Sequence, residues 1–168
     1  VHSNEFLQKI MQVLGLGCDE DSILTCLKVL IDENPDYNLN NNRGYWCAPL
    51  HYATIIRLEK VALYFIEKGS DVNKLDMYQN NALNYAVGLY EYKTICEVKR
   101  ANKEMPVLVN KLIEKQVNVG NINGISKLYP IHEAIKNQYY DSHLLIKLRM
   151  HYILNADIPI IKETDEYK

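Results

Sequence analysis

The stretch Ala48–Asn73, APLHYATIIRLEKVALYFIEKGSDVN, contains the signals of two short helices joined by a turn. Pro49 suits the first turn of a helix, because its missing N–H would have had no partner there. Leu50, Ala53 and Thr54 then follow at the i, i+3 and i+4 spacing that places side chains on one helix face. The stretch therefore predicts a short first helix whose inner face carries small side chains.

A second helix is expected in the same stretch, and a similar one is expected earlier in the chain. Gly69 stands where the second helix should end in a left-handed residue. In the earlier helix Ser22 is expected to be the N-terminal cap. The apolar stripes of the two helices are formed by Val61, Ala62, Phe65 and Ile66 and by Ile23, Leu24, Leu27, Leu30 and Ile31.

This pattern recurs with a period of 33 residues. Asn40 in DYNLN aligns with Asn73 in SDVNK, and Leu50 in APLH aligns with Leu83 in NALN. A period of this size indicates stacked supersecondary units. One such unit cannot bury its own apolar face, so it must stack on its neighbours. We therefore expect an all-α fold of about four helix-turn-helix units with short connecting turns.

The repeated stretch resembles the ankyrin-repeat family. The family pattern contains Asp, a turn Gly, Thr-Pro-Leu-His, Ala-Ala and a closing Gly-Ala-Asp-Val-Asn, and residues 48–76 are similar to it nearly throughout. The resemblance implies a single ankyrin-repeat solenoid domain over residues 1–168. Because the chain begins with Val and ends without a cap, we expect a fragment of a longer protein. The expected units are 4–40, 41–73, 74–120 and 121–160.

Several positions depart from the family pattern. Trp46 stands where the family has its turn Gly, with Gly44 two residues earlier, so this turn must be built differently. The family's Thr–His pair, which links neighbouring units, is also altered. Its Thr is replaced by Ala48, Asn81 and Tyr129, while its His is kept as His51 and His132 and replaced by Asn84.

The third unit is longer than the period. From Asn73 to the equivalent Gly120 the chain runs 47 residues, which is 14 more than one repeat, and the excess lies near 91–105. A smaller insertion lies at 136–143. Insertions in repeat arrays map to loops on one face, and loops often carry function. A tolerated extension without function is the other interpretation.

The resemblance also implies a binding surface. In the family, partners dock on the turn tips and on the short first helices, which together form a concave face. Aromatic residues and Arg commonly dominate the energy of such interfaces. An alternative for Trp46 is that it folds back to fill the space left by the missing Thr and Gly. The partner-binding positions implied are Arg43, Tyr45, Trp46, Ile55, Ile56, Met77, Tyr78, Leu89 and Tyr90.

The amino-acid composition of the chain limits the classes of partner and ligand that we expect it to bind. Lys and Arg number 19 against 21 Asp and Glu, giving a net charge of -2, which argues against nucleic acid as the main ligand. No apolar run approaches the roughly 18 residues of a membrane span, so no membrane insertion is expected. The four cysteines share no spacing typical of disulfides or zinc, which favours a reducing compartment, the cytoplasm or the nucleus. We expect no metal and no cofactor.

Catalysis is not expected either. Cys47 and His51 lie four residues apart, but the repeat accounts for His51 and no orienting acid is evident. His143 and His151 share a helix with cations, which favours a solvated face over a metal site.

The sequence thus predicts a non-enzymatic module that binds a protein or peptide. The alternative is a structural segment of a larger scaffold that associates with itself, because the ends of a repeat stack expose apolar faces, such as that of the helix expected at 144–154.

Overall fold

The computed structural model describes residues 3–88, 103–139 and 145–150 of the chain, which form helices and connecting turns and include no strand. The all-α prediction is confirmed for these residues. Residues 145–150 are helical, and the other helices are α1 (Ser3–Leu14), α2 (Glu20–Asp32), α3 (Pro49–Ile55), α4 (Glu59–Glu67), α5 (Ala82–Val87), α6 (Pro106–Glu114) and α7 (Pro130–Lys136).

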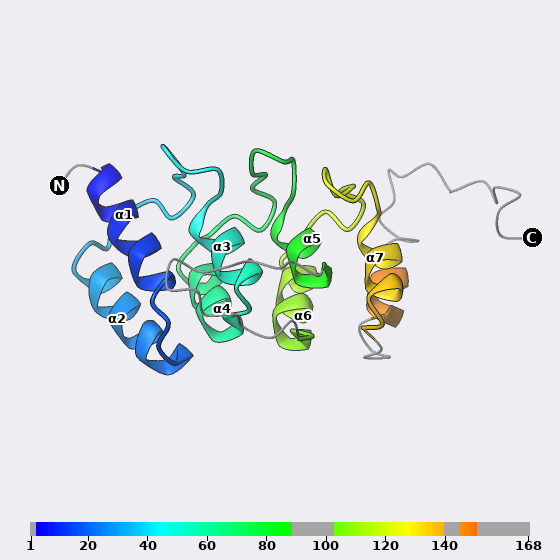
Figure 1. Cartoon of the computed structure of the whole chain (residues 1–168), viewed down its shortest axis with the longest axis horizontal. Helices are drawn as coiled ribbons and strands as arrows, with labels where there is room; N and C mark the ends of the chain where they lie inside the picture. Colours follow the sequence, from blue (N-terminus) through cyan, green and yellow to red (C-terminus); the bar gives the residue numbers. More distant parts are fainter. Residues whose placement is uncertain (1–2, 89–102, 140–144, 151–168) are drawn as a thin grey trace, which may run out of the picture.

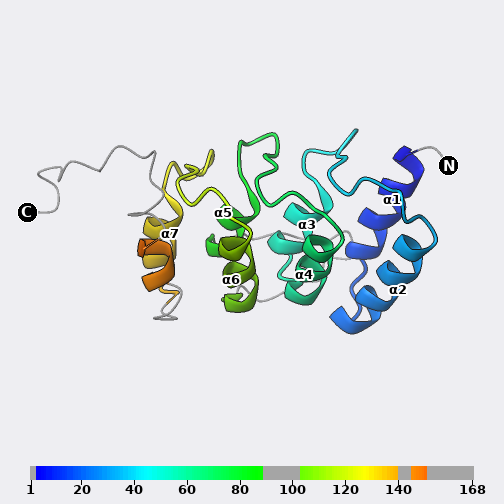
Figure 2. The ribbon, with the colours of Figure 1, turned by 180° about the vertical axis from the view of Figure 1, so that it is seen from behind.

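The helices pack as pairs that stand side by side in a row (Figures 1 and 2). Helix α1 packs on α2, α3 on α4, and α5 on α6. Between pairs, α1, α3, α5 and α7 contact one another in sequence and form one layer, while α2, α4 and α6 form the second. The turns between pairs project together along one edge of the row (Figure 1).

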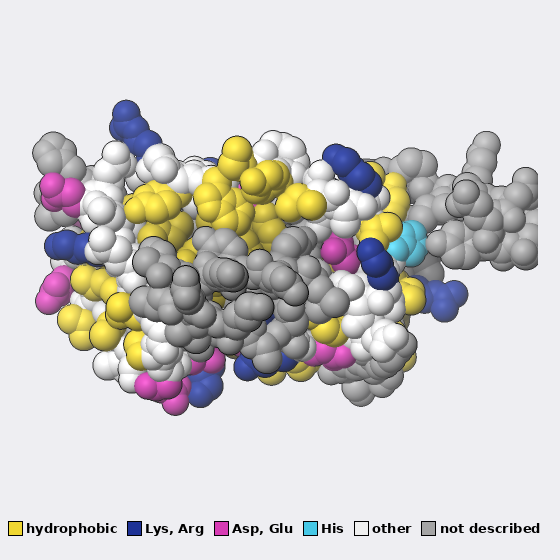
Figure 3. Space-filling model, viewed as in Figure 1, with side chains coloured by type: hydrophobic (Ala, Val, Ile, Leu, Met, Phe, Trp, Pro, Cys, Tyr) yellow, Lys and Arg dark blue, Asp and Glu magenta, His cyan; other side chains and the backbone are white. Residues whose placement is uncertain are grey.

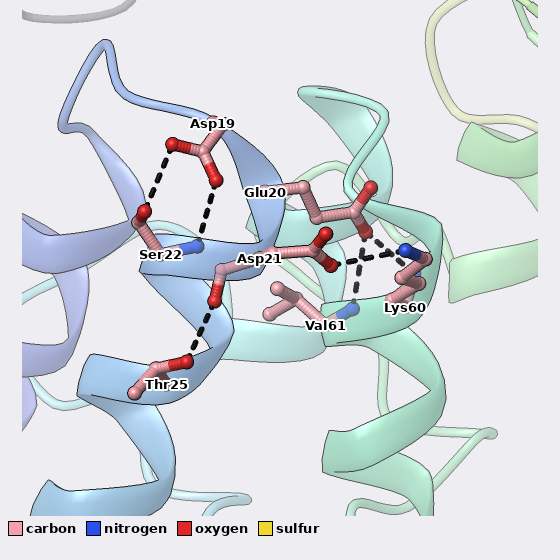
Figure 4. Close-up of polar contacts among 7 residues, drawn as sticks. All are labelled: Asp19, Glu20, Asp21, Ser22, Thr25, Lys60 and Val61. Carbon is pink, nitrogen blue, oxygen red and sulfur yellow. Dashed lines mark hydrogen bonds and ion pairs between the residues drawn. The ribbon is translucent and has the colours of Figure 1, made fainter.

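The start of α3 follows the prediction, whereas the start of α2 does not. Pro49 and Pro106 begin α3 and α6, where a missing N–H costs nothing. The assignment of Ser22 as the cap of α2 was wrong. Asp19 is the cap, because its carboxylate accepts hydrogen bonds from the Ser22 N–H at 3.0 Å and from the Ser22 hydroxyl at 2.8 Å (Figure 4). The carboxylate is also the better partner for the positive end of the helix dipole.

The helix ends repeat one backbone geometry in different units. Gly69 after α4 has φ +98, as predicted for a left-handed end, and Gln116 after α6 has φ +61. Arg57 after α3 and Gln138 after α7 have φ +65 and +59. In each case the next residue donates its N–H to the carbonyl five residues back, which satisfies a terminal carbonyl of the helix.

Arg57 also ties the first-layer helices together. Its buried guanidinium donates hydrogen bonds to the carbonyls of Tyr85 at 2.9 Å and Ala86 at 3.3 Å, and to that of Gly88. These carbonyls lie at the end of α5, where the Tyr85 carbonyl also accepts the Gly88 N–H at 3.3 Å and the last carbonyls of a helix otherwise have no partner within it. Asn137 of the next unit adds a bond to the Val87 carbonyl at 2.8 Å.

Glutamates in the first turns join the second-layer helices. Glu20 of α2 accepts hydrogen bonds from the N–H groups of Lys60 at 2.6 Å and Val61 at 3.3 Å, at the start of α4 (Figure 4). Glu59 of α4 accepts in turn from the Leu108 N–H of α6 at 3.1 Å. Each carboxylate therefore satisfies unpaired donors at the N-terminus of the next helix.

Asn side chains join the same units at the ends of the second helices. Asn40 accepts from the Asp71 N–H at 2.6 Å and donates to the Gly69 carbonyl at 3.3 Å. Asn73 makes the equivalent pair of bonds, from the Asn118 N–H at 2.7 Å and to the Gln116 carbonyl at 3.2 Å. The two Asn residues are 33 positions apart, and the groups they bond are 47 positions apart because the longer third unit lies between them.

The core is one continuous apolar cluster that runs through all the pairs. Ala53, Ala86 and Ala134 occupy the same place in α3, α5 and α7, and all three are buried. Small side chains there let neighbouring first helices approach closely, as the sequence predicted for the first of them. No helix among the described residues is long and apolar enough to cross a membrane.

Gly124 provides a test of how closely the turns pack. A Cβ atom at Gly124 would lie 1.7 Å from the carbonyl oxygen of Tyr78 in the preceding turn, whereas one at Gly44 would meet nothing within 4 Å. We expect Gly124→Ala to lower the free energy of unfolding by about 2 kcal/mol or more, because backbone must move.

Gly44→Ala is the matched control. Gly44 has φ +86, so an alanine there should lower the free energy of unfolding by about 1 kcal/mol, through the left-handed backbone alone. Denaturant unfolding followed by circular dichroism measures both. Equal losses in the two variants would contradict the close contact.

Candidate binding surface at the turn edge

Three turns stand side by side along one edge of the stack, and we call them the turn edge: residues 41–47, 74–80 and 121–129 (Figure 1). The second turn is built around the buried carboxylate of Asp76. It accepts hydrogen bonds from the N–H groups of Tyr78 at 2.9 Å and Asn80 at 3.0 Å, and from the hydroxyl of Tyr85. This carboxylate fixes the turn to α5.

The third turn uses an amide in the same place. Asn123 accepts from the N–H groups of Ile125 at 2.8 Å and Ser126 at 3.1 Å, and it donates to the Glu133 carboxylate at 3.2 Å. Burial raises the pKa of Glu133, while the hydrogen bonds from Ser126 and Asn123 act in the opposite direction. The turn is therefore fixed to α7 as the second turn is to α5.

Direct hydrogen bonds also fix the turns to one another. The Met77 N–H donates to the Trp46 carbonyl at 3.0 Å, which joins the first and second turns. Asn80 joins the second and third, since its side-chain oxygen accepts from the Gly124 N–H at 2.8 Å and its amide donates to Asn123 at 3.3 Å. The turn edge is thus held in one arrangement before any partner binds.

The first turn differs from the other two, as the sequence indicated. Its left-handed residue is Gly44 with φ +86, and the turn is closed by a hydrogen bond from the Tyr45 N–H to the Asn42 carbonyl at 2.8 Å. In the second turn the left-handed residue is Gln79, at the position that aligns with Trp46. Trp46 is therefore free to turn its ring toward the next unit.

The predicted turn-tip residues lie at or near the surface of this edge. Arg43 is exposed, and Tyr45 and Trp46 are half-buried against the core. Met77 and Tyr78 are 63% and 46% exposed. Figure 3 shows hydrophobic side chains gathered over the turns that precede α3 and α5.

Two interpretations were given for Trp46, that it belongs to a binding surface and that it fills space inside the stack. The contacts of its ring bear on both. Its ring centroid lies 6.5 Å from that of the buried Tyr85 and 5.7 Å from that of the exposed Tyr78, both in edge-to-face geometry. The ring therefore fills space between the first turn and α5, and it also supports the exposed Tyr78. Edge-to-face pairs of this kind stabilise beyond the area they bury.

The partner-binding positions predicted on the first helices are not found at the exposed surface of the described residues. Ile55 and Ile56, at the end of α3, are each 3% exposed and belong to the core cluster, so their apolar area is already covered. Leu89, Tyr90 and most of the insertion at 91–105 lie outside the described residues. The turn tips alone thus offer exposed predicted residues in the described part of the chain.

Sequence analysis missed the apolar residues of the third turn. Ile122 and Ile125 are 45% and 54% exposed, in the places that Leu75 and Tyr78 hold in the second turn. The signal was present, because adding the 47-residue spacing of the longer unit to Leu75 and Tyr78 gives these two positions.

Of the Cys47–His51 pair, His51 helps to hold neighbouring units together and Cys47 is buried in the core. His51 accepts the Ala48 N–H on Nδ1 at 3.0 Å, and its Nε2 donates to the Lys74 carbonyl at 2.7 Å. Both ring nitrogens are therefore occupied. Burial, with the nearby Asp76 carboxylate as a second cause, raises the pKa of the Cys47 thiol, which stays protonated at neutral pH.

Asn84 makes the same two bonds in the next unit. Its side-chain oxygen accepts from the Asn81 N–H at 3.0 Å, and its amide donates to the Asn121 carbonyl at 2.8 Å. Asn81 also caps α5, because its side chain accepts from the Asn84 N–H at 3.1 Å. The replacement of His by Asn therefore preserves the link between units.

A groove lies between α2 and α4. The groove has a volume of about 450 Å³, and its lining carries both ammonium and carboxylate groups. The Tyr64 hydroxyl is buried there without a hydrogen-bond partner among the described residues. Because charges of both signs line it, the groove favours no single class of ligand. No group of three or more potential metal ligands occurs in the described ranges.

Comparison of the chain with models of protein families finds no match, and neither does comparison with curated protein sequences. The ankyrin resemblance therefore remains an interpretation of the repeated residues and contacts.

His51 predicts a dependence of stability on pH. Burial is the main cause that lowers the pKa of His51 below its ordinary value, so the folded state keeps the ring neutral. The unfolded state binds the proton more readily, and stability should fall as pH drops below about 6.5. Denaturant unfolding between neutral and mildly acidic pH measures this.

His51→Asn is the matched variant, because Asn84 shows that Asn can make both bonds and Asn does not titrate. We expect the variant to lose less of its stability on acidification than the wild type. His51→Ala should be destabilised at every pH by about 2 kcal/mol. Equal acid sensitivity in wild type and His51→Asn would contradict the assignment.

Proposed function

We propose that the chain is an ankyrin-type solenoid that binds another protein or peptide through its turn edge and has no catalytic role. The repeat assignment is supported by contacts that recur at the sequence period, above all the Asn40 and Asn73 bonds and the equivalent roles of His51 and Asn84. Such a stack gives each turn a fixed neighbour.

The observation that carries the binding proposal is the exposed apolar surface on a rigid turn edge. Met77, Tyr78 and Ile125 expose about half or more of their area, on turns that are hydrogen-bonded to one another. A contiguous exposed apolar patch is typical of an interaction site. Because the turns are already ordered, binding loses little conformational entropy.

The proposal also includes a reducing location, the cytoplasm or the nucleus. Cys18 and Cys26 are exposed and Cys47 is buried, and none of these three described cysteines forms a disulfide. Exposed free thiols are the usual state in compartments that keep cysteines reduced.

The binding proposal is tested by comparing two triple variants in affinity capture from cells. The first, Met77→Ser, Tyr78→Ser and Ile125→Ser, removes the exposed side chains of the turn edge. The second, Val29→Ser, Val107→Ser and Ile146→Ser, removes apolar side chains of 54–56% exposure from helices elsewhere. We expect a protein that the wild type and the second variant retain and that the first variant loses.

All these positions are exposed, so both variants should remain folded, which circular dichroism checks. A captured protein that both variants retain would contradict binding through the turn edge. A captured protein that both lose equally would indicate nonspecific apolar adhesion.

Self-association is the second candidate function, and exposed apolar residues at the two ends of the row favour it. Leu16 and Val29 are exposed on the first pair, and Ile146 and Met150 on the last described helix. Association of one end with the other would cover both. Light scattering should then show a mass that rises with concentration and falls on Val29→Glu with Met150→Glu, whereas a monomeric mass at all concentrations contradicts it.

A further inference from the structure

The charges of the turn edge are unequal in sign. Arg43 and Lys127 are exposed on the first and third turns, and Lys74 is half-exposed on the second. The only acidic residue of the three turns is Asp76, which is buried and accepts hydrogen bonds within its own turn. The surface that the turns present to solvent therefore carries cations without accompanying carboxylates.

Two carboxylates lie beneath and beside the turns, the buried Glu133 and the exposed Asp71, and each accepts hydrogen bonds from the chain itself. Glu133 is buried and accepts from Asn123 and from the Ser126 hydroxyl at 3.0 Å. Asp71, which lies before the second turn, accepts the Asn73 N–H at 2.8 Å. None of these groups is in an ion pair with a cation of the turn edge among the described residues.

The cations and the apolar side chains alternate along the edge. Met77 and Tyr78 lie on the second turn, between the turns that carry Arg43 and Lys127, and Ile125 precedes Lys127 by two residues. Figure 3 shows Lys or Arg side chains at both ends of the hydrophobic patch. A complementary partner must therefore offer apolar side chains at its centre and negative charge around them.

We propose that the turn edge recognises an acidic peptide segment, one in which Asp or Glu residues flank large apolar side chains. This inference rests on the proposed binding function and specifies the chemistry of the partner. Carboxylates would approach Arg43, Lys74 and Lys127, while apolar side chains cover Met77, Tyr78 and Ile125.

A nucleic acid also carries negative charge but fits this surface less well. Strong phosphate binding needs a broad basic face, whereas the chain has a net charge of -2. Of the exposed side chains Met77, Tyr78 and Ile125, only Tyr78 offers a ring on which a base could stack. The two ligand classes separate in the experiment below.

The experiment is selection of binders from a random-peptide display library by three forms of the chain. They are the wild type, Arg43→Glu with Lys127→Glu, and the control Lys9→Glu with Lys136→Glu. The two variants change the net charge equally, and all four positions are exposed. Circular dichroism checks the fold. Binding of each selected peptide is then measured by the fluorescence of Trp46, which is the single tryptophan of the chain and lies at the turn edge.

We expect the wild type and the control to select peptides rich in Asp, Glu and large apolar residues. The affinity of these peptides should fall about tenfold in Arg43→Glu with Lys127→Glu and change less than about twofold in the control. Added salt should weaken wild-type binding and remove most of this difference.

Selection of neutral or basic peptides by the wild type, equal losses in both variants, or no selected peptide at all would overturn the inference. Tighter binding of a mixed-sequence single-stranded oligonucleotide than of the acidic peptides would also overturn it. The proposed function is judged separately by the Met77, Tyr78 and Ile125 variant in cell capture. A partner lost by that variant, together with neutral selected peptides, would leave binding intact and reject only the acidic chemistry.

Discussion

The structure depends on buried polar side chains that reach from one helical pair to the backbone of the next. His51 and Asn84 each accept a helix-start N–H of their own unit and donate to a carbonyl of the following one. Apolar contacts between stacked pairs are not directional, whereas these bonds require one particular rotation between neighbours. They therefore fix the angle at which successive pairs, and with them successive turns, stand along the row.

The fixed arrangement of the turns along the turn edge follows from this constraint. The bond from Met77 to Trp46 and the bonds of Asn80 to the third turn form only if the pairs beneath are in register. Within the second and third turns, the side chains of Asp76 and Asn123 accept the backbone hydrogen bonds that hold each turn together. The apolar and basic side chains on the outside can consequently vary without disturbing the turns, which separates the residues that define the fold from those available for recognition.

Local signals in the sequence predicted the helical content, the proline start of α3 and the left-handed Gly69, because each depends on a few neighbouring residues. The cap of α2 was misplaced, since Ser and Asp three residues apart are both good caps and only the backbone decides between them. The burial of Ile55 and Ile56 depends on packing between units, which spacing alone does not specify. The third turn was overlooked although the period locates it.

Several joints between helices are held in left-handed backbone by residues other than glycine. Gln79, Gln116, Lys127 and Gln138 all have φ near +60, and none of them has the Cβ-free backbone that this region favours. Arg57 differs, because its side chain closes α5. At the other four positions the stack accepts conformational strain that a single substitution would relieve. The native sequence is therefore less stable than its own backbone allows, and a consensus version could be made more resistant to heat while its outer surface stays the same.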